Sequence, residues 1–131
     1  MSAFFDSNVI LYATDQDGDL RRTTLALLDA GGTISVQVLN ETSSVLRRKY
    51  DFSFDRIRSF LVAVREKCDV VPLSLAVHER GLAYAERYRL SVYDAMIVAS
   101  AVLAGCTTLY SEDMHDGLVI DGLTVRNPYQ S

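Results

Sequence analysis

Residues 3–12 read Ala-Phe-Phe-Asp-Ser-Asn-Val-Ile-Leu-Tyr, and this stretch is the clearest indication of the fold. Its first three residues are apolar, as expected for a short buried strand. Asp6, Ser7 and Asn8 then supply side chains that cap helices, and an apolar segment follows from Val9. The order of strand, acid and helix predicts an α/β unit at the start of the chain.

The same alternation continues through the rest of the sequence. Further strands are expected at residues 33–35, 69–74, 107–110 and 123–125. Helices are expected at residues 20–30, 36–50, 54–67, 75–88 and 91–104. Because helices separate the strands and no linker or repeat interrupts them, we predict one α/β domain, residues 1–131. Its mainly parallel sheet should be covered by helices on both faces.

Composition indicates a soluble protein. The 131 residues are 49% hydrophobic and 23% charged, and the chain has neither a signal peptide pattern nor an apolar run long enough for a bilayer. Cys68 and Cys106 lie far apart without metal-ligand spacing, so we expect both to be reduced. We therefore expect a cytoplasmic protein. The net charge of −4 is unusual for a nucleic-acid binder unless bound cations invert the field locally.

Four acids occupy positions where such a sheet would place a ligand site. Asp6 and Asp113 follow expected strands, so both should project from the same carboxyl edge. Asp94 stands in the first turn of its expected helix. Glu41 shares the apolar stripe of its helix with Val38, which is an unusual place for an acid.

Each acid also has a purely structural interpretation. Asp6 could serve only as a helix N-cap, and Asp94 follows Ser91 with capping-box spacing. Glu41 could reach water from the edge of its stripe, and Asp113 could be a turn residue. Their combination is more informative, because carboxylates that converge must take up protons or bind a cation. Hard oxygen ligands favour Mg²⁺, with Mn²⁺ as a substitute, and the neighbours Asn8 and Ser111 could orient them.

Four short motifs resemble the PIN-domain family, and within it the VapC-like toxins of toxin–antitoxin pairs. The first motif contains Asp6 in Phe-Asp-Ser-Asn-Val-Ile, and the second contains Glu41 in Val-Leu-Asn-Glu. The third contains Asp94 in Ser-Val-Tyr-Asp-Ala-Met-Ile-Val-Ala, and the fourth contains Asp113 in Leu-Tyr-Ser-Glu-Asp. The resemblance covers essentially the whole chain.

This resemblance implies a three-layer α/β/α sandwich and Mg²⁺- or Mn²⁺-dependent endoribonuclease activity. Asp6, Glu41, Asp94 and Asp113 would be its catalytic, metal-binding residues. The products would carry a 5′-phosphate and a 3′-hydroxyl. The toxin branch further implies a homodimer and a cognate antitoxin protein. In the fourth motif, Glu112 or Asp116 could replace Asp113 or share its role, with Asp116 otherwise a supporting residue.

Basic side chains are candidates for contacts with RNA phosphates outside the metal site. They are Arg21, Arg22, Arg47, Arg48 and Lys49. Simple solvation of a basic helix end explains the last three equally well.

Two other functions are compatible with parts of the sequence. In an aspartate-nucleophile phosphatase, Asp6 would be phosphorylated, but Asn8 stands where such enzymes carry a second Asp, and neither Lys49 nor Lys67 follows a strand as expected. A PIN-like protein-binding module would use the acids only as caps, although such modules typically lack one or more of the four.

Overall fold

The computed structural model describes residues 2–130. Its strands are β1 (Ala3–Phe5), β2 (Gly32–Ser35), β3 (Cys68–Val71), β4 (Thr108–Tyr110), β5 (Val119–Ile120) and β6 (Leu123–Arg126). Its helices are α1 (Ser7–Leu11), the 3₁₀ turn η1 (Tyr12–Thr14), α2 (Gly18–Asp29), α3 (Val36–Arg48), α4 (Phe54–Lys67), α5 (Leu75–Tyr88) and α6 (Val92–Leu103). Within residues 2–130, each helix is too short or too polar to cross a bilayer.

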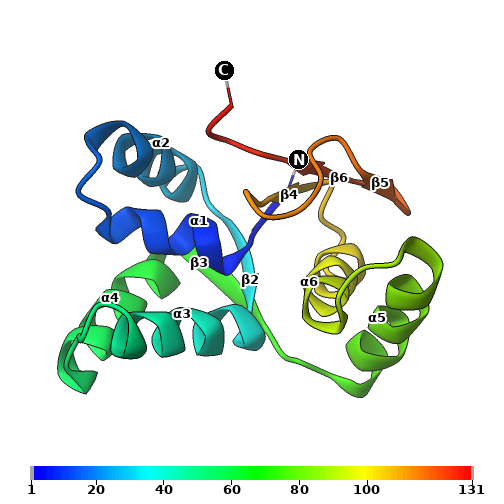
Figure 1. Ribbon diagram of the computed structural model, residues 1–131, viewed down its shortest axis with the longest axis horizontal. Coiled ribbons are helices and arrows are strands. Elements are labelled where there is room, and N and C mark those ends of the chain that lie inside the picture. The colour runs from blue at the N-terminus through cyan, green and yellow to red at the C-terminus, as the bar shows by residue number, and fades with distance from the viewer. Residues whose placement is uncertain (1, 131) are drawn as a thin grey trace.

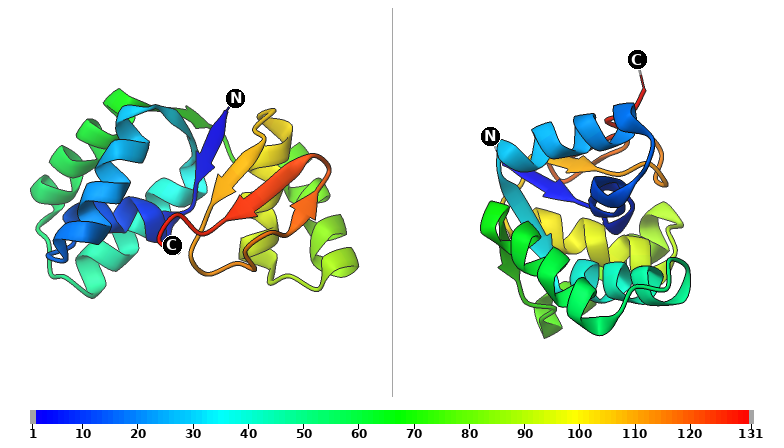
Figure 2. Two further views of the ribbon diagram at one scale, coloured as in Figure 1. Left: turned by 90° about the horizontal axis from the view of Figure 1, so that it is seen from above. Right: turned by 90° about the vertical axis from the view of Figure 1, so that its left-hand side faces the viewer.

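The strands form one sheet in the order β3-β2-β1-β4-β6-β5. All neighbouring pairs are parallel except β5 with β6. Helices α1 to α4 gather at one end of the molecule and α5 and α6 at the other, as Figures 1 and 2 show. The sheet is mainly parallel and flanked by helices, which confirms the predicted α/β/α sandwich.

The strand order reverses at β1. The chain passes from β1 outward through β2 to β3, and then returns to place β4 on the other side of β1. In an open parallel sheet, this reversal opens a crevice beyond the carboxyl ends of the two central strands. Residues that follow β1 and β4 are therefore the ones expected to line a ligand site.

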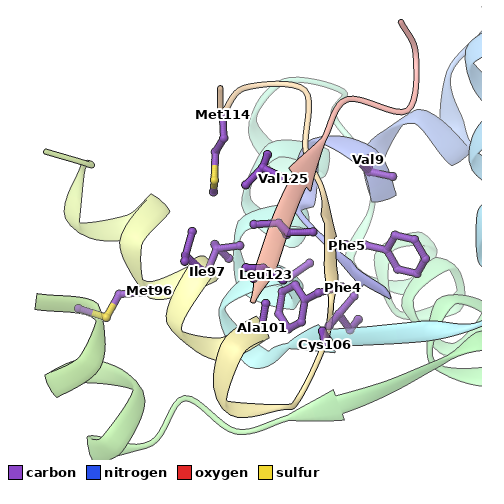
Figure 3. Close-up of a cluster of buried hydrophobic side chains, with 14 of the residues drawn as sticks. Phe4, Phe5, Val9, Met96, Ile97, Ala101, Cys106, Met114, Leu123 and Val125 are labelled. Carbon is purple, nitrogen blue, oxygen red and sulfur yellow. The ribbon is translucent and has the colours of Figure 1, made fainter. Parts of the chain in front are cut away.

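Buried side chains hold the two central strands in place. Phe4 and Phe5 are both fully buried and point to opposite sides of β1 (Figure 3), as successive residues of a strand must. Phe4 lies on the side of α6, whose residues 95–101 are all buried. An unbroken buried run is expected for a helix packed across a sheet and against α5, and it fixes the start of α6 relative to β1.

Four boundaries differ from those predicted. Strand β3 ends at Val71 because Pro72 has no N–H for the ladder. Helix α2 begins two residues early, because the side chain of Asp17 accepts hydrogen bonds from the N–H groups of Asp19 and Leu20. The short strand β5 was not predicted. Helix α1 ends at Leu11 and continues as the η1 turn rather than as α-helix.

Gly32 is where the fold should tolerate substitution least. It begins β2, and a Cβ built there would lie 2.5 Å from the Phe5 ring and 2.9 Å from the carbonyl oxygen of Ala3. Gly32→Ala should therefore lower the free energy of unfolding by about 1 to 3 kcal/mol through overpacking. Urea denaturation would measure the change. Gly18→Ala is the matched control, since its Cβ meets nothing closer than 3.5 Å; equal effects would contradict the packing argument.

Candidate active site

Asp6 is the first residue beyond β1 and lies at the reversal of the strand order. Its backbone N–H still pairs with the carbonyl of Tyr110 at the end of β4, 3.0 Å away. Its Oδ1 accepts a hydrogen bond from the Ser7 N–H at 2.7 Å, and its Oδ2 accepts one from the Ser111 hydroxyl at 2.8 Å. Asp6 is thus an N-cap, as its structural interpretation predicts, and is also held for a second purpose by a residue that follows β4.

The four acids predicted from the sequence line one cleft of about 310 Å³. The residues that line it are Asp6, Ser7, Glu41, Ser44, Val45, Arg48, Asp94 and Asp113. They come from the ends of β1 and β4, from one side of α3 and from the first turn of α6. The cleft therefore occupies the position that the strand order predicts for a ligand site.

Glu41 is half-buried and is held by two donors. Ser7 donates its hydroxyl to Oε1 at 3.1 Å, and Gln37 donates its amide to Oε2 at 3.1 Å. The same amide group of Gln37, which is buried, also donates to the backbone carbonyl of Tyr93 at 3.1 Å. Because Tyr93 precedes Asp94, Gln37 ties the acid of α3 to the start of α6.

Asn8 connects the remaining parts of the site. Its side-chain amide donates to Oδ2 of Asp6 at 3.2 Å, to the Ser111 hydroxyl at 3.4 Å and to Oδ2 of Asp113 at 3.1 Å. Its carbonyl oxygen accepts the backbone N–H of Glu112 at 3.1 Å. Asn8 and Ser111 therefore hold the loop after β4 against the start of α1, in agreement with their predicted orienting role.

The three acids of the fourth motif point to different places. Asp113 faces the cleft, whereas Glu112 accepts a hydrogen bond from the hydroxyl of Tyr12 at 2.5 Å. Asp116 accepts the backbone N–H of Asn127 at 2.8 Å and does not line the cleft. The structure thus brings Asp113, and neither of its acidic neighbours, to the other three acids.

Burial and mutual repulsion make the charged form of Asp6 costly. Burial raises the pKa of this carboxyl to about 6, and the negative charges of Glu41 and Asp94 raise it further in the same direction. The hydrogen bonds from Ser111 and Ser7 oppose this rise, because they stabilise the carboxylate. A cation in the cleft would relieve the cost that these hydrogen bonds only partly offset.

Asp94 has a similar environment. Burial raises the pKa of its carboxyl, the nearby charge of Asp113 adds to the rise, and a hydrogen bond with Ser91 opposes it. Ser91 also caps α6 by accepting the backbone N–H of Asp94 at 3.2 Å. The predicted capping role of Ser91 and the placement of Asp94 in the cleft therefore coexist.

The donor set of the cleft fits a hard divalent cation. Its carboxylates and the hydroxyls of Ser7 and Ser44 are all oxygen ligands, and no histidine or cysteine lines it. Across residues 2–130, no three Asp, Glu, His or Cys side chains are already closed into a metal-binding cluster. The acids line the cleft rather than meet at one point, so the fit rests on their chemistry, shared location and raised pKa values.

Of the five basic residues predicted to contact phosphates, the structure places only Arg48 in the cleft. Arg47 instead donates to the backbone carbonyl of Phe52 at 3.1 Å and lies 3.8 Å from Asp51. Its neighbour Lys49 lies over the Tyr50 ring, 5.9 Å from the centroid. The remaining two, Arg21 and Arg22, are on α2.

Three contributors to the site were not predicted: Ser7, Gln37 and Ser44. Gln37 and Ser44 lie four residues before and three residues after Glu41. On a helix this spacing places them on the face of Glu41, which is the signal that could have identified them. Ser7 adjoins Asp6 and was predicted only as a possible cap.

The sequence matches the family model of the PIN domain over residues 3–115, a segment that contains all four acids. The chain belongs to the PIN-domain family. This confirms the family predicted from the four motifs. No match was found among curated proteins.

Solved structures of toxin–antitoxin proteins share this PIN-domain fold. A chain from a toxin–antitoxin complex of Klebsiella pneumoniae is 26% identical, with a TM-score of 0.76 over 99% of this chain and 100% of that one. VapC20 of Mycobacterium tuberculosis, a sarcin-ricin loop cleaving toxin, is 19% identical, with a TM-score of 0.69 over 86% and 90%. A chain of VapBC2 from Rickettsia felis is 20% identical, with a TM-score of 0.71 over 97% and 98%.

The raised pKa of Asp6 predicts a specific dependence of stability on pH. The folded pKa of about 6 exceeds the unfolded value near 3.9, so the folded state binds this proton more tightly. The resulting stabilisation is complete below about pH 4 and is lost as the pH rises through 6. In chelator, Asp6→Asn should raise the free energy of unfolding by about 1 to 3 kcal/mol at pH 7.5 and change it little at pH 4.

Urea denaturation at the two pH values would measure this difference. Asn keeps an oxygen for the cap, so the variant removes the charge with little loss of hydrogen bonding. Asp55→Asn, at an exposed side chain, should show no comparable gain. An equal effect of Asp6→Asn at both pH values would contradict the assigned electrostatics.

Proposed function

We propose that the chain is a Mg²⁺-dependent endoribonuclease and the toxin of a toxin–antitoxin pair, with Mn²⁺ as a substitute metal. The observation that carries the proposal is the meeting of Asp6, Glu41, Asp94 and Asp113 in one cleft at the reversal of the strand order. Membership of the PIN-domain family and the fold shared with toxins such as VapC20 support it.

In this proposal the four acids hold one or two metal ions. The metal would act as a Lewis acid toward the scissile phosphate and make an attacking water more acidic. The protein supplies the position of each carboxylate: Ser111 and Asn8 orient Asp6, Asn8 orients Asp113, and Gln37 orients Glu41. Such oriented hydrogen bonds limit the reorganisation that cation binding requires.

Arg48 is the candidate for a phosphate contact beside the metal. It lines the cleft on the same side of α3 as Glu41, seven residues further along, which is about 10 Å along a helix axis. A guanidinium at this distance can pair with a phosphate next to the scissile one. Arg21, Arg22, Arg47 and Lys49 would add weaker, unspecific attraction for RNA.

The environment of Asp6 disfavours the phosphatase alternative. Asn8 donates to Asp6 where a second carboxylate would be needed, and neither lysine lines the cleft. Lys67 pairs with Asp29 at 3.0 Å instead. The protein-binding alternative is disfavoured by the raised pKa values of Asp6 and Asp94, because a scaffold gains nothing from grouping acids at that cost.

The proposal includes three further elements: an antitoxin, a homodimer and a cytoplasmic location. Relatives of this fold were solved as toxin–antitoxin complexes, and an arginine from an antitoxin could offset the charge of the acidic cleft. Exposed apolar side chains at Leu73, Leu75, Val92 and Tyr93 surround a hollow of about 480 Å³ and support a homodimer contact. The free thiols of Cys68 and Cys106 suit a reducing compartment.

Cleavage of total RNA is the direct test of the nuclease. Purified protein should cut RNA in Mg²⁺ or Mn²⁺ and not in chelator. Asp94→Asn and Asp113→Asn should each reduce the rate at least about 100-fold, because each removes a charged oxygen ligand. Asp116→Asn is the matched control, because this acid bonds to Asn127 outside the cleft, and it should keep most activity. Full activity in Asp94→Asn would overturn the proposal.

The partner claim can be tested separately with a purified candidate antitoxin. It should bind the wild-type chain and stop RNA cleavage at a molar ratio near one to one. Because charge pairing with the acids would contribute to binding, Glu41→Gln should weaken the complex by about tenfold. Calorimetry measures the affinity. Failure to bind, or binding without inhibition, would remove the antitoxin from the proposal and leave the nuclease in place.

A further inference from the structure

A second hollow lies beyond the carboxyl end of α3, separate from the acidic cleft. It has a volume of about 410 Å³ and is lined by Thr14, Asp15, Gln16, Tyr50, Phe52 and Arg56. These residues belong to the segment after α1 and to the loop that joins α3 to α4. In Figure 1, α1 and α3 lie side by side and lead from the sheet toward this end of the molecule.

Two side chains give the hollow flat surfaces. The Tyr50 ring is 49% exposed, although the surrounding loop offers apolar neighbours. The guanidinium carbon of Arg56 lies 3.8 Å from the centroid of the Phe52 ring, and that ring is itself buried beside Leu46 and Ile57. The Arg56 side chain is therefore supported from below, and a long flexible side chain becomes a fixed planar surface.

The charges around the hollow suit a nucleotide. Arg47 and Arg58 each have an acidic partner, at 3.8 and 3.1 Å, whereas within residues 2–130 Arg48 and Arg56 form no ion pair. Asp15 also lines the hollow, with one carboxylate oxygen accepting the N–H of Asp17 at 2.7 Å. An acidic acceptor beside Arg56 repels a phosphate inside the hollow but can accept a hydrogen bond from a base edge.

The hollow is also in line with the acidic cleft. Glu41 and Arg48 both line that cleft, and Tyr50 follows Arg48 by two residues. A single strand that passes from the acids over Arg48 therefore reaches Tyr50 next. Unpaired bases of RNA are commonly bound by stacking on aromatic rings and on guanidinium planes.

We propose that this hollow binds one unpaired nucleobase of the RNA substrate, by stacking between Tyr50 and Arg56, while Arg48 contacts the connecting phosphate. This inference rests on the proposed ribonuclease function and adds a substrate subsite to it. The subsite makes the enzyme a reader of single-stranded RNA, and it places one recognised nucleotide on the α3 side of the scissile bond.

Binding of a labelled single-stranded RNA to the cleavage-deficient Asp94→Asn protein tests the subsite, with Mg²⁺ present and fluorescence anisotropy as the measurement. Tyr50→Ala and Arg56→Ala should each weaken binding by about five- to hundredfold, the usual range for a lost stacking contact. Tyr50→Phe keeps the ring and should bind like the parent. Arg58→Ala is the matched control on the same helix and should change the affinity less than twofold.

An RNA that lacks one base at each position in turn identifies the stacked nucleotide. One abasic position should weaken binding to the Asp94→Asn parent as much as Tyr50→Ala does, and it should cost nothing more in the Tyr50→Ala variant. With otherwise wild-type protein, Tyr50→Ala should raise KM for cleavage and leave kcat nearly unchanged. Thermal melting verifies that each variant is folded.

Two results would overturn the subsite and leave the nuclease intact. The first is RNA affinity and KM that are unchanged in Tyr50→Ala and Arg56→Ala. The second is a loss of affinity for the antitoxin alone, which would assign the hollow to a protein partner. If the wild-type chain neither cleaves nor binds RNA, the proposed function itself fails, and the subsite fails with it.

Discussion

The site depends on one electrostatic constraint, the repulsion among carboxylates that the backbone forces into a common cleft. Asp6 has no freedom to move away, because its N–H continues the pairing of β1 with β4 and its side chain caps α1. Glu41 and Asp94 approach it from α3 and from the first turn of α6. Packing of these helices onto the sheet thus holds together charges that would otherwise separate.

A small set of neutral side chains makes this arrangement sustainable. Ser111, Asn8 and Gln37 each bridge two elements that are distant in sequence, and all three direct donors at carboxylates. Tyr12 extends this network by holding Glu112, so that the loop after β4 is anchored on both sides of Asp113. These contacts orient the acids without neutralising them, which leaves the cleft suited to a cation.

Much of this could be predicted from the sequence because local signals coincide with the global fold. Ser53 and Ser91 mark the starts of α4 and α6 by their capping side chains, and Asp6 marks the end of β1. The sequence could not choose among Glu112, Asp113 and Asp116. Their directions are set by hydrogen bonds to partners about 100 and 11 residues away, and no local pattern encodes such contacts. The same limit applies to the basic helix end, where only contact with Phe52 separates the role of Arg47 from that of Arg48.

Calorimetric titration of the purified protein with Mn²⁺ at pH 7.5 tests most directly whether the four acids form a metal site. The account predicts saturable binding to the wild-type chain, strong loss of that binding in Asp6→Asn and Asp94→Asn, and little change in Asp116→Asn. Binding that is absent from the wild type, or that survives unchanged in Asp6→Asn and Asp94→Asn, would contradict the account.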